Sequence, residues 1–175
     1  MVKNKIIPTV VLSAICIAVA LILSVANIFT APKIEENQRK KVTEALKEVY
    51  PQSESFEEVD ISSLGLPTEI SAVYAANDGG YVFKASVKGY STGLVIMCGI
   101  DAEGKITGTR YIESKETNGA EKILDGSFNG LTSGSALPEF IKGSTRTSEA
   151  YRSAVELSFR SFEILKSAEA GGQAE

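Results

Sequence analysis

Residues 80–114 read GYVFKASVKGYSTGLVIMCGIDAEGKITGTRYIES, and this stretch decides the fold. Its first strand alternates an apolar set with a mostly polar set, namely Tyr81, Phe83, Ala85 and Val87 against Val82, Lys84, Ser86 and Lys88. The uncharged run 94–100 follows, then the turn DAEGK at 101–105 and a second alternating segment at 106–114. This pattern predicts an antiparallel meander with the uncharged strand in a central position.

One helix is predicted before the meander in the sequence and another after it. Residues 147–168 carry an apolar stripe at helical spacing, formed by Tyr151, Val155, Phe159, Phe162 and Leu165. Residues 33–51 carry a shorter stripe and end at a proline; its members are Val42, Ala45, Leu46 and Val49. Both segments are typical of amphipathic helices that cover a sheet. The segment 52–70, before the meander, is turn-rich and is interpreted as a connector, with a short helix or an edge strand as alternatives. The segment 115–140, after the meander, is interpreted as an irregular binding loop.

A membrane anchor precedes these elements. Residues 6–29 carry no charge and, as a helix, exceed a hydrocarbon core of about 30 Å. A signal peptide has a shorter apolar stretch of about 7–15 residues. A lipoprotein signal resembles this run less well, because Ile15 stands before Cys16 and a long uncharged stretch follows. We therefore expect a retained transmembrane helix.

The charges beside this helix predict its orientation. Lys3 and Lys5 lie on the short N-terminal side, which favours a cytoplasmic N-terminus, and a long domain after the helix translocates largely regardless of charge. The expected fold class is α+β, with a single N-terminal transmembrane helix and an extracytoplasmic antiparallel-sheet domain that ends in a helix. The expected divisions are a cytoplasmic N-terminus at 1–5, the transmembrane helix at 6–29, a juxtamembrane helix and connector at 30–74, the sheet domain at 75–168 and a flexible tail at 169–175.

Composition excludes several kinds of chemistry. The 175 residues include no histidine, which rules out histidine-ligated metals and serine–histidine–aspartate catalysis. The net charge of −4 argues against nucleic acid as a partner, because phosphate binding needs a basic face. The two cysteines, Cys16 and Cys98, are too far apart in the chain for the paired spacing of a metal site, and each is expected to be a small buried apolar residue.

A cluster of hydroxyls precedes the terminal helix, in the stretch IKGSTRTSEAY at 141–151. Thr147 and Ser148 suit the N-cap of that helix. Helix capping does not account for the hydroxyl of Thr145. This residue follows Gly143 and Ser144, a pair that permits a tight turn. A helix N-terminus also stabilises an anion such as a phosphate, with Lys142 and Arg146 as added counter-charge.

Two segments resemble a known family. GLVIMCGIDAEGKITGTRYIESKETNGAEK resembles the flavin-binding domain shared by the G subunit of Rnf electron transport complexes and the C subunit of sodium-translocating NADH:quinone reductase, in which GID and GKI lead to His-x-Glu-Thr-Pro-Gly. The hydroxyl cluster resembles that family's attachment motif, Asp-x-x-Ser/Thr-Gly-Ala-Thr. The anchor and the following RKKVTEALKEVYP also resemble the Rnf protein, and the chain length favours it over its longer reductase relative.

This resemblance implies an FMN-binding domain with FMN joined covalently, as a phosphoester, to Thr145. It also implies that Glu116, Thr117 and Gly119 line the ring or the ribityl chain, beside Gly143 and Ser144. No catalytic residue and no metal ligand is expected, since FMN itself carries the electrons. A separate flavin transferase is implied as a partner, because that family receives its FMN from FAD.

Several positions depart from the family pattern. Glu139 stands in place of Asp, Lys142 in place of Ser or Thr, and Ser144 in place of Ala. Upstream, the replacements are Ser114 for His, Asn118 for Pro, and Ala120-Glu121 for Leu-Gly. These changes affect the expected efficiency of flavin attachment more than the expected fold.

The function implied is that of a membrane-anchored electron carrier in an Rnf-type, ion-translocating ferredoxin/NAD oxidoreductase complex, with the other members of the complex as partners. The chain has no glycine-rich nucleotide motif after a strand, so it is expected to be a relay within a translocase and not the dehydrogenase. The alternative is an extracytoplasmic flavin-binding or assembly module outside that complex, with loose or absent flavin.

Overall fold

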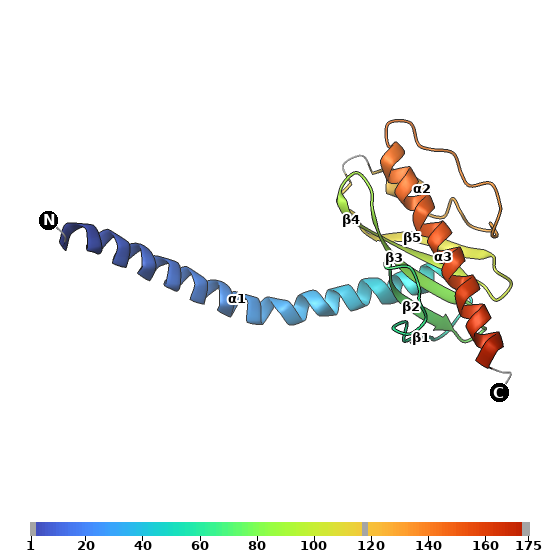
Figure 1. Cartoon of the computed structure of the whole chain (residues 1–175), viewed down its shortest axis with the longest axis horizontal. Coiled ribbons are helices and arrows are strands. Elements are labelled where there is room, and N and C mark those ends of the chain that lie inside the picture. The colour runs from blue at the N-terminus through green and yellow to red at the C-terminus, as the bar shows by residue number, and fades with distance from the viewer. Residues whose placement is uncertain (1–2, 117–118, 173–175) are drawn as a thin grey trace. The chain divides into compact units, whose positions relative to one another are not determined.

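The computed structural model describes residues 3–116 and 119–172. Helix α1 (Lys3–Val49) comes first, a five-stranded sheet follows, and a short helix α2 (Ala120–Leu124) precedes the long C-terminal helix α3 (Thr145–Gly172) (Figure 1). The chain divides into two units between Lys41 and Val42. The expected α+β class is therefore confirmed.

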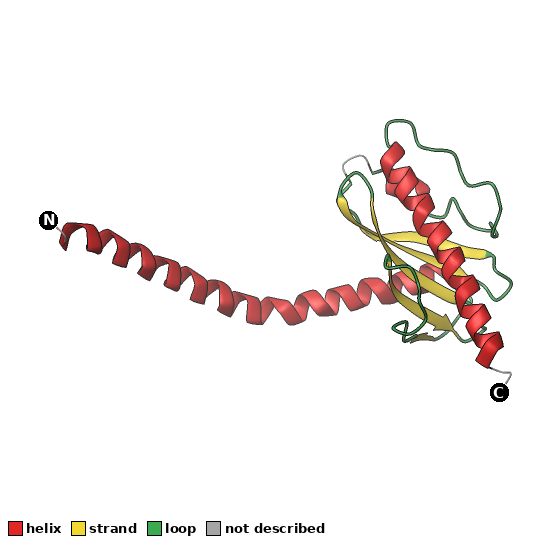
Figure 2. Cartoon of the chain, in the orientation of Figure 1, coloured by secondary structure: helices red, strands yellow, loops and turns green. Residues whose placement is uncertain are grey.

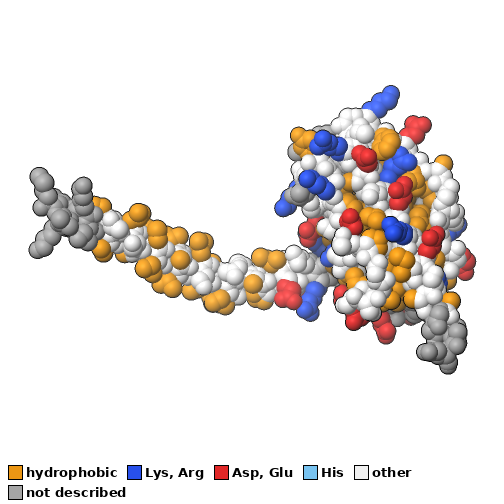
Figure 3. Space-filling model, in the orientation of Figure 1, with side chains coloured by type: hydrophobic (Ala, Val, Ile, Leu, Met, Phe, Trp, Pro, Cys, Tyr) orange, Lys and Arg blue, Asp and Glu red, His pale blue; other side chains and the backbone are white. Residues whose placement is uncertain are grey.

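The first unit ends at Lys41 and contains the apolar part of α1. Its hydrophobic side chains are exposed along the helix, as the orange side chains in Figure 3 show. It belongs to the one helix in the described part of the chain that is long and apolar enough to cross a membrane. The helix continues through Pro32, where we had expected the transmembrane and juxtamembrane helices to be separate, because a proline can kink a helix without ending it. Cys16 is exposed on this helix, so the prediction that it is buried is wrong.

The second unit is built on an antiparallel meander. Its strands are β1 (Phe56–Glu58), β2 (Ile70–Ala76), β3 (Tyr81–Lys88), β4 (Thr92–Ile100) and β5 (Ile106–Glu113), and they pair in that order. The predicted meander of β3, β4 and β5 is confirmed, with β4 between the other two. The stretch 52–70, interpreted as a connector, contains β1, and this strand agrees with the edge strand that was one of the two alternatives. It also contains the start of β2, which was not predicted.

Helix α3 covers one face of the sheet (Figure 2). The predicted stripe lies entirely in this core, from Tyr151, which is fully buried, to Leu165. It packs on the side chains of β3 that alternate toward it, including Phe83 and Ala85. The interpretation of 147–168 as a sheet-covering helix is confirmed, although the helix begins at Thr145 and continues to Gly172.

The opposite face receives the last turns of α1. Ala45, Leu46, Val49 and Tyr50 form a second buried cluster with Val82 and Met97. The helix approaches closely because three glycines, Gly80, Gly99 and Gly108, lie beneath it; we call them the glycine trough. A Cβ at Gly108 would stand 2.6 Å from the carbonyl oxygen of Val49, and one at Gly80 would overlap the Tyr50 hydroxyl. Thr107 also donates a hydrogen bond of 2.7 Å to the Val49 carbonyl.

The two edge strands of the sheet, β5 and β1, are protected in different ways. The backbone of residues 126–131 covers β5: Gly130 donates to the carbonyl of Ile106, and the amide of Ile106 donates to the carbonyl of Leu131, both at 2.8 Å. The other edge strand, β1, is only three residues long and exposes Glu57 and Glu58. The long irregular passage after β5 therefore closes one edge of the sheet.

Candidate functional site

The hydroxyl cluster lies where the chain turns from a loop into α3. Gly143 adopts a φ of 83°, a left-handed conformation that suits glycine, and the helix begins two residues later at Thr145. The first amides of a helix have no acceptor within the helix, and its N-terminus carries partial positive charge. The cluster thus sits at a place that favours an anion.

Exposure separates the four hydroxyls at 144–148. Ser148 and Thr147 are 0% and 3% exposed, and Ser144 is 9% exposed. Thr145 is exposed, as is the following Arg146. Of these four described hydroxyls, Thr145 is therefore the one that a modifying enzyme can reach.

The buried hydroxyls hold the turn together. Ser148 donates to the carbonyl of Ser144 at 3.0 Å and accepts a hydrogen bond of 3.1 Å from the amide of Ile141. Since α3 begins at Thr145, Thr147 and Ser148 lie inside its first turn. The prediction that they form the N-cap is wrong, because the helix starts earlier than its apolar stripe indicates.

Glu116 connects three segments around Thr145. Its carboxylate accepts hydrogen bonds from the Thr147 hydroxyl at 2.5 Å and from the amides of Tyr90 and Ser91 at 3.2 and 3.0 Å. Its side chain also fills the space beside Gly89, where an added Cβ would stand 2.6 Å from a carboxylate oxygen. The loop between β3 and β4 is thereby fixed against the start of α3.

These groups enclose a pocket of about 450 Å³, which we call the attachment pocket; it is lined by residues 143–147, Tyr90 and Glu116. Its volume falls within the range of about 300–1,000 Å³ that is typical of small-molecule sites. It combines an exposed hydroxyl, a guanidinium and a helix N-terminus. This donor set fits a phosphate monoester such as that of FMN.

The structure brings most of the predicted site residues together. Four of them line the attachment pocket: Glu116, Gly143, Ser144 and Thr145. Gly119 does not line it; this residue lies before α2 with a φ of 64°, and its role at the flavin stays a prediction. Thr117 lies outside the described residues.

Sequence reasoning missed Tyr90 as a lining residue. It is 66% exposed, and it lies in the loop that joins β3 to β4. The sequence offers only the GYS stretch as a turn signal there, so nothing in the local pattern brings it to Thr145. Tyr81, which we did not place in the site, is buried instead; burial and a hydrogen bond to Glu169 raise its pKa to about 12.

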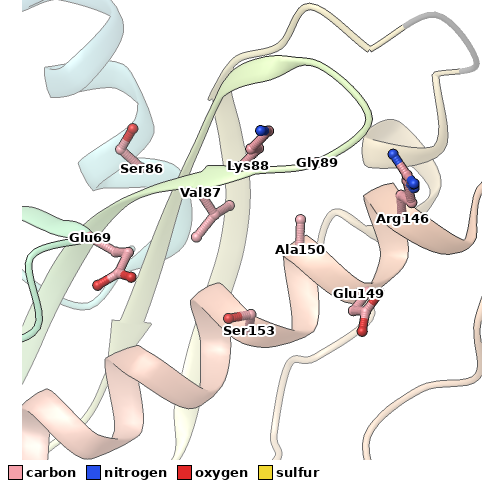
Figure 4. Close-up of a pocket in the computed structure, with 9 residues that line it drawn as sticks. All are labelled: Glu69, Ser86, Val87, Lys88, Gly89, Arg146, Glu149, Ala150 and Ser153. Atoms are coloured by element: carbon pink, nitrogen blue, oxygen red, sulfur yellow. The ribbon is translucent and has the colours of Figure 1, made fainter.

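A second hollow of about 520 Å³ adjoins the first, and we call it the β3-end groove (Figure 4). It lies between the end of β3, from Ser86 to Gly89, and the first turns of α3, from Arg146 to Ser153. Arg146 lines both hollows. The two hollows are therefore neighbours beside the start of α3.

Comparison with known proteins shows the family to which this chain belongs. The FMN-binding domain family matches residues 89–159, which include every residue that lines the attachment pocket. The chain is 31% identical to the G subunit of the Na(+)-translocating ferredoxin:NAD(+) oxidoreductase complex of Acetobacterium woodii, over 89% of its own length and 90% of that protein. The chain belongs to the G-subunit family of ion-translocating oxidoreductase complexes.

A second relative supports the same family. The chain is 31% identical to the G subunit of the ion-translocating oxidoreductase complex of Stutzerimonas stutzeri over 64% of its own length, and it spans 53% of that relative. Because the Acetobacterium protein is matched over nearly its whole length, the match includes part of the apolar helix as well as the FMN-binding domain. The resemblance recognised from the GID, GKI and attachment motifs is confirmed.

Proposed function

We propose that this chain is the G subunit of an ion-translocating ferredoxin:NAD oxidoreductase complex and carries FMN as a covalent phosphoester on Thr145. The observation that supports the attachment point most strongly is the exposure of Thr145 at the start of α3, beside hydroxyls that are buried. The relatives' names support the place in a complex. FMN supplies the electron-transfer chemistry, and the chain supplies its binding and environment.

Attachment of FMN requires one bond exchange. The Thr145 Oγ forms an ester bond to the FMN phosphorus of FAD, the phosphoanhydride bond of FAD breaks, AMP leaves, and the hydroxyl proton passes to solvent. No oxidation is involved. A flavin transferase catalyses this step in the proposal, since the described pocket offers Glu116 only as a carboxylate already engaged by three donors.

The chain's own residues then hold the phosphate. Arg146 and the first amides of α3 stabilise its negative charge, and Glu116 keeps the β3–β4 loop against the helix start. A covalent link suits a domain on the outer face of a membrane, where a dissociating cofactor is lost by dilution. We accordingly propose that residues 6–29 cross the membrane with the N-terminus in the cytoplasm.

The proposed arrangement of the chain follows from this orientation. Residues 1–5 lie in the cytoplasm, and 30–74 hold the juxtamembrane helix and a connector that includes β1 and most of β2. The rest of the FMN-binding domain lies in 75–168, and the tail at 169–175 begins on the last turn of α3. The other membrane proteins of the complex and the flavin transferase are the proposed partners.

The experiment is coexpression of the full chain with a flavin transferase, followed by a denaturing gel viewed for flavin fluorescence. The wild type is expected to give a fluorescent band and Thr145→Ala none. Ser144→Ala is the matched control, because it removes the adjacent hydroxyl and restores the family's residue, and it is expected to keep the band. A fluorescent Thr145→Ala band would refute the attachment point, and a colourless wild type would favour a flavin-binding or assembly module outside the complex.

A further inference from the structure

We propose that the surface around the start of α3 docks the flavin transferase, with the side chain of Phe140 as the main contact. This inference rests on the proposed function. The surface consists of Tyr90, Phe140 and Arg152, and we call it the α3-start surface. The partner that fits it has an apolar cleft beside its active site, which receives the aromatic side chain of Phe140, and a carboxylate that pairs with the guanidinium of Arg152.

Exposed apolar side chains of the second unit gather near Thr145. In the described part of this unit, the exposed large hydrophobic residues are Tyr90, Ile123 and Phe140, at 66%, 67% and 46%. Tyr90 lies in the β3–β4 loop and lines the attachment pocket together with Thr145. This loop and the start of α3 lie at the same end of the sheet (Figure 1). Phe140 precedes Thr145 by only five residues, so two of the three lie close to the proposed attachment point.

Arg152 holds the ring of Phe140 in place. The guanidinium carbon of Arg152 lies 4.5 Å from the ring centroid, which is a cation–π contact. Arg152 follows Thr145 by seven residues, nearly two turns of α3, so the two residues share one face of the helix about 10 Å apart. Because the ring is already held, a partner that binds it loses little conformational entropy. Phe140 is therefore a preformed contact near Thr145.

The geometry of the transfer reaction indicates which partner covers this surface. Thr145 has to enter the active site of the transferase, so the transferase lies over the start of α3 during transfer. A specific interface buries about 800 Å² on each partner, which corresponds to a disc of about 16 Å radius. Arg152, about 10 Å from Thr145 along α3, lies inside this disc, whereas Arg160, about 22 Å from Thr145, lies outside it.

The residue types agree with this assignment. Tyrosine and arginine are enriched among the residues that contribute most of the binding energy in protein interfaces, and aromatic residues in general are enriched there. The α3-start surface combines two aromatic side chains with an arginine. A docking partner can therefore obtain much of its affinity from these three residues.

The test measures flavin transfer to the purified full chain, made without transferase, as a function of chain concentration. Phe140→Ala is expected to raise the KM for the chain at least about fivefold and to leave kcat unchanged, because the contact binds the chain without touching the reacting atoms. Phe140→Tyr keeps the aromatic ring and is expected to stay close to the wild-type KM. Equal KM values for the wild type and Phe140→Ala would overturn the docking surface.

Binding without reaction gives a second readout. The Thr145→Ala chain has no hydroxyl to receive FMN, so its Kd for the transferase can be measured without turnover. Adding Phe140→Ala to this chain is expected to raise the Kd by about the same factor as the KM. An unchanged Kd would overturn the docking surface as well.

A second pair of variants applies if Phe140→Ala does not fold. Arg152→Ala removes the cation that holds the ring, and it is expected to raise the KM for the chain. Arg160→Ala is the matched control, because this exposed arginine lies on the same helix but outside the disc, and it is expected to leave the KM unchanged. Equal KM values for the two variants would overturn the docking surface.

The wild type separates the two hypotheses. A wild-type chain without attached flavin refutes the proposed function. A flavinylated wild type, with wild-type KM and Kd in the variants, leaves the proposed function intact and overturns the docking surface. If such variants then fail to copurify with the other membrane proteins of the complex, the surface belongs to those proteins and not to the transferase.

Discussion

The carboxylate of Glu116 accepts a hydrogen bond from the hydroxyl of Thr147 at 2.5 Å, across 31 residues of sequence. The same carboxylate accepts two amides of the β3–β4 loop. Glu116 was expected to line the flavin, and it does line the attachment pocket, but all of its described hydrogen bonds hold the protein itself. We therefore interpret Glu116 as a positioning residue.

Replacing Glu116 is expected to loosen the attachment pocket. Glu116→Ala removes an acceptor from three donors and should lower the free energy of unfolding by about 1.5–3 kcal/mol, together with the yield of covalent flavin. Glu116→Gln keeps one acceptor oxygen but turns an NH2 group toward a donor, so it should restore only part of both. Chemical denaturation and gel fluorescence measure the two effects. Equal yields in the wild type and Glu116→Ala would contradict the positioning role.

Restoring the family's attachment motif is expected to raise the flavinylated fraction. The combined variant Glu139→Asp, Lys142→Thr and Ser144→Ala replaces the three departures, and Lys142 is exposed, so its replacement leaves the core unchanged. Intact mass spectrometry after limited coexpression gives the fraction directly. The same three changes in a Thr145→Ala background are the control and should give no attached flavin. A lower fraction in the restored chain would show that the departures suit its own transferase.

Filling the glycine trough is expected to displace the end of α1. Gly108→Ala places a Cβ against the Val49 backbone and should cost about 1–3 kcal/mol of unfolding free energy. Gly134→Ala is the comparison, because Gly134 has a φ of 85° and open space around its Cα; strain alone should cost about 1 kcal/mol there. Denaturation of the detergent-solubilised chain measures both. A smaller loss of unfolding free energy for Gly108→Ala than for Gly134→Ala would argue against close packing of Val49 over Gly108.

Cys98 is expected to resist alkylation. It is 1% exposed, and burial raises its pKa to about 12 although Ser158 bonds the thiol. In a Cys16→Ser background, labelling of the native protein at pH 8 should be at least about 100-fold slower than labelling of the denatured chain. Because the folded-state pKa is raised, the native state holds this proton more tightly, and its contribution to stability is lost as pH rises from about 9 toward 12. Rapid native labelling would contradict this burial.

Removing the carboxylate of Glu121 is expected to stabilise the protein. Glu121 is 4% exposed, and one of its carboxylate oxygens has no hydrogen-bond partner in the described part of the chain. It stands where the family has glycine. Glu121→Met keeps the volume and should raise the melting temperature by about 2–8 °C, whereas the exposed neighbour variant Lys122→Met should not. A lower melting temperature for Glu121→Met would show that the carboxylate is satisfied.

The fold was predictable where one pattern dominates a segment. The alternation of Tyr81 to Lys88 and the stripe on α3 mark the two surfaces that pack against each other, so sequence spacing is enough to predict them, although Val82 is also buried on the opposite face of the sheet. Strand β2 was missed because its burial does not alternate: Val73 is fully buried beside Ala72, which is also buried. Small apolar residues of this kind do not distinguish a strand from a connector.

The site was predictable only in part. Thr145 came from a short motif, and its exposure agrees with that choice. The bonds of Glu116 and the presence of Tyr90 depend on loops that meet only after folding, and no spacing along the chain encodes that meeting. The covalent link and the membrane orientation stay predictions.

The covered edge at β5 and the short edge strand β1 limit how this protein can associate with other chains. A long open edge offers unpaired backbone groups to a strand from another chain, which leads to sheet extension or aggregation. Here residues 126–131 occupy the β5 edge, and β1 offers three residues with two exposed glutamates at the other. Assembly with neighbouring proteins therefore has to proceed through side chains and loops, and crowded copies in a membrane are protected from joining edge to edge.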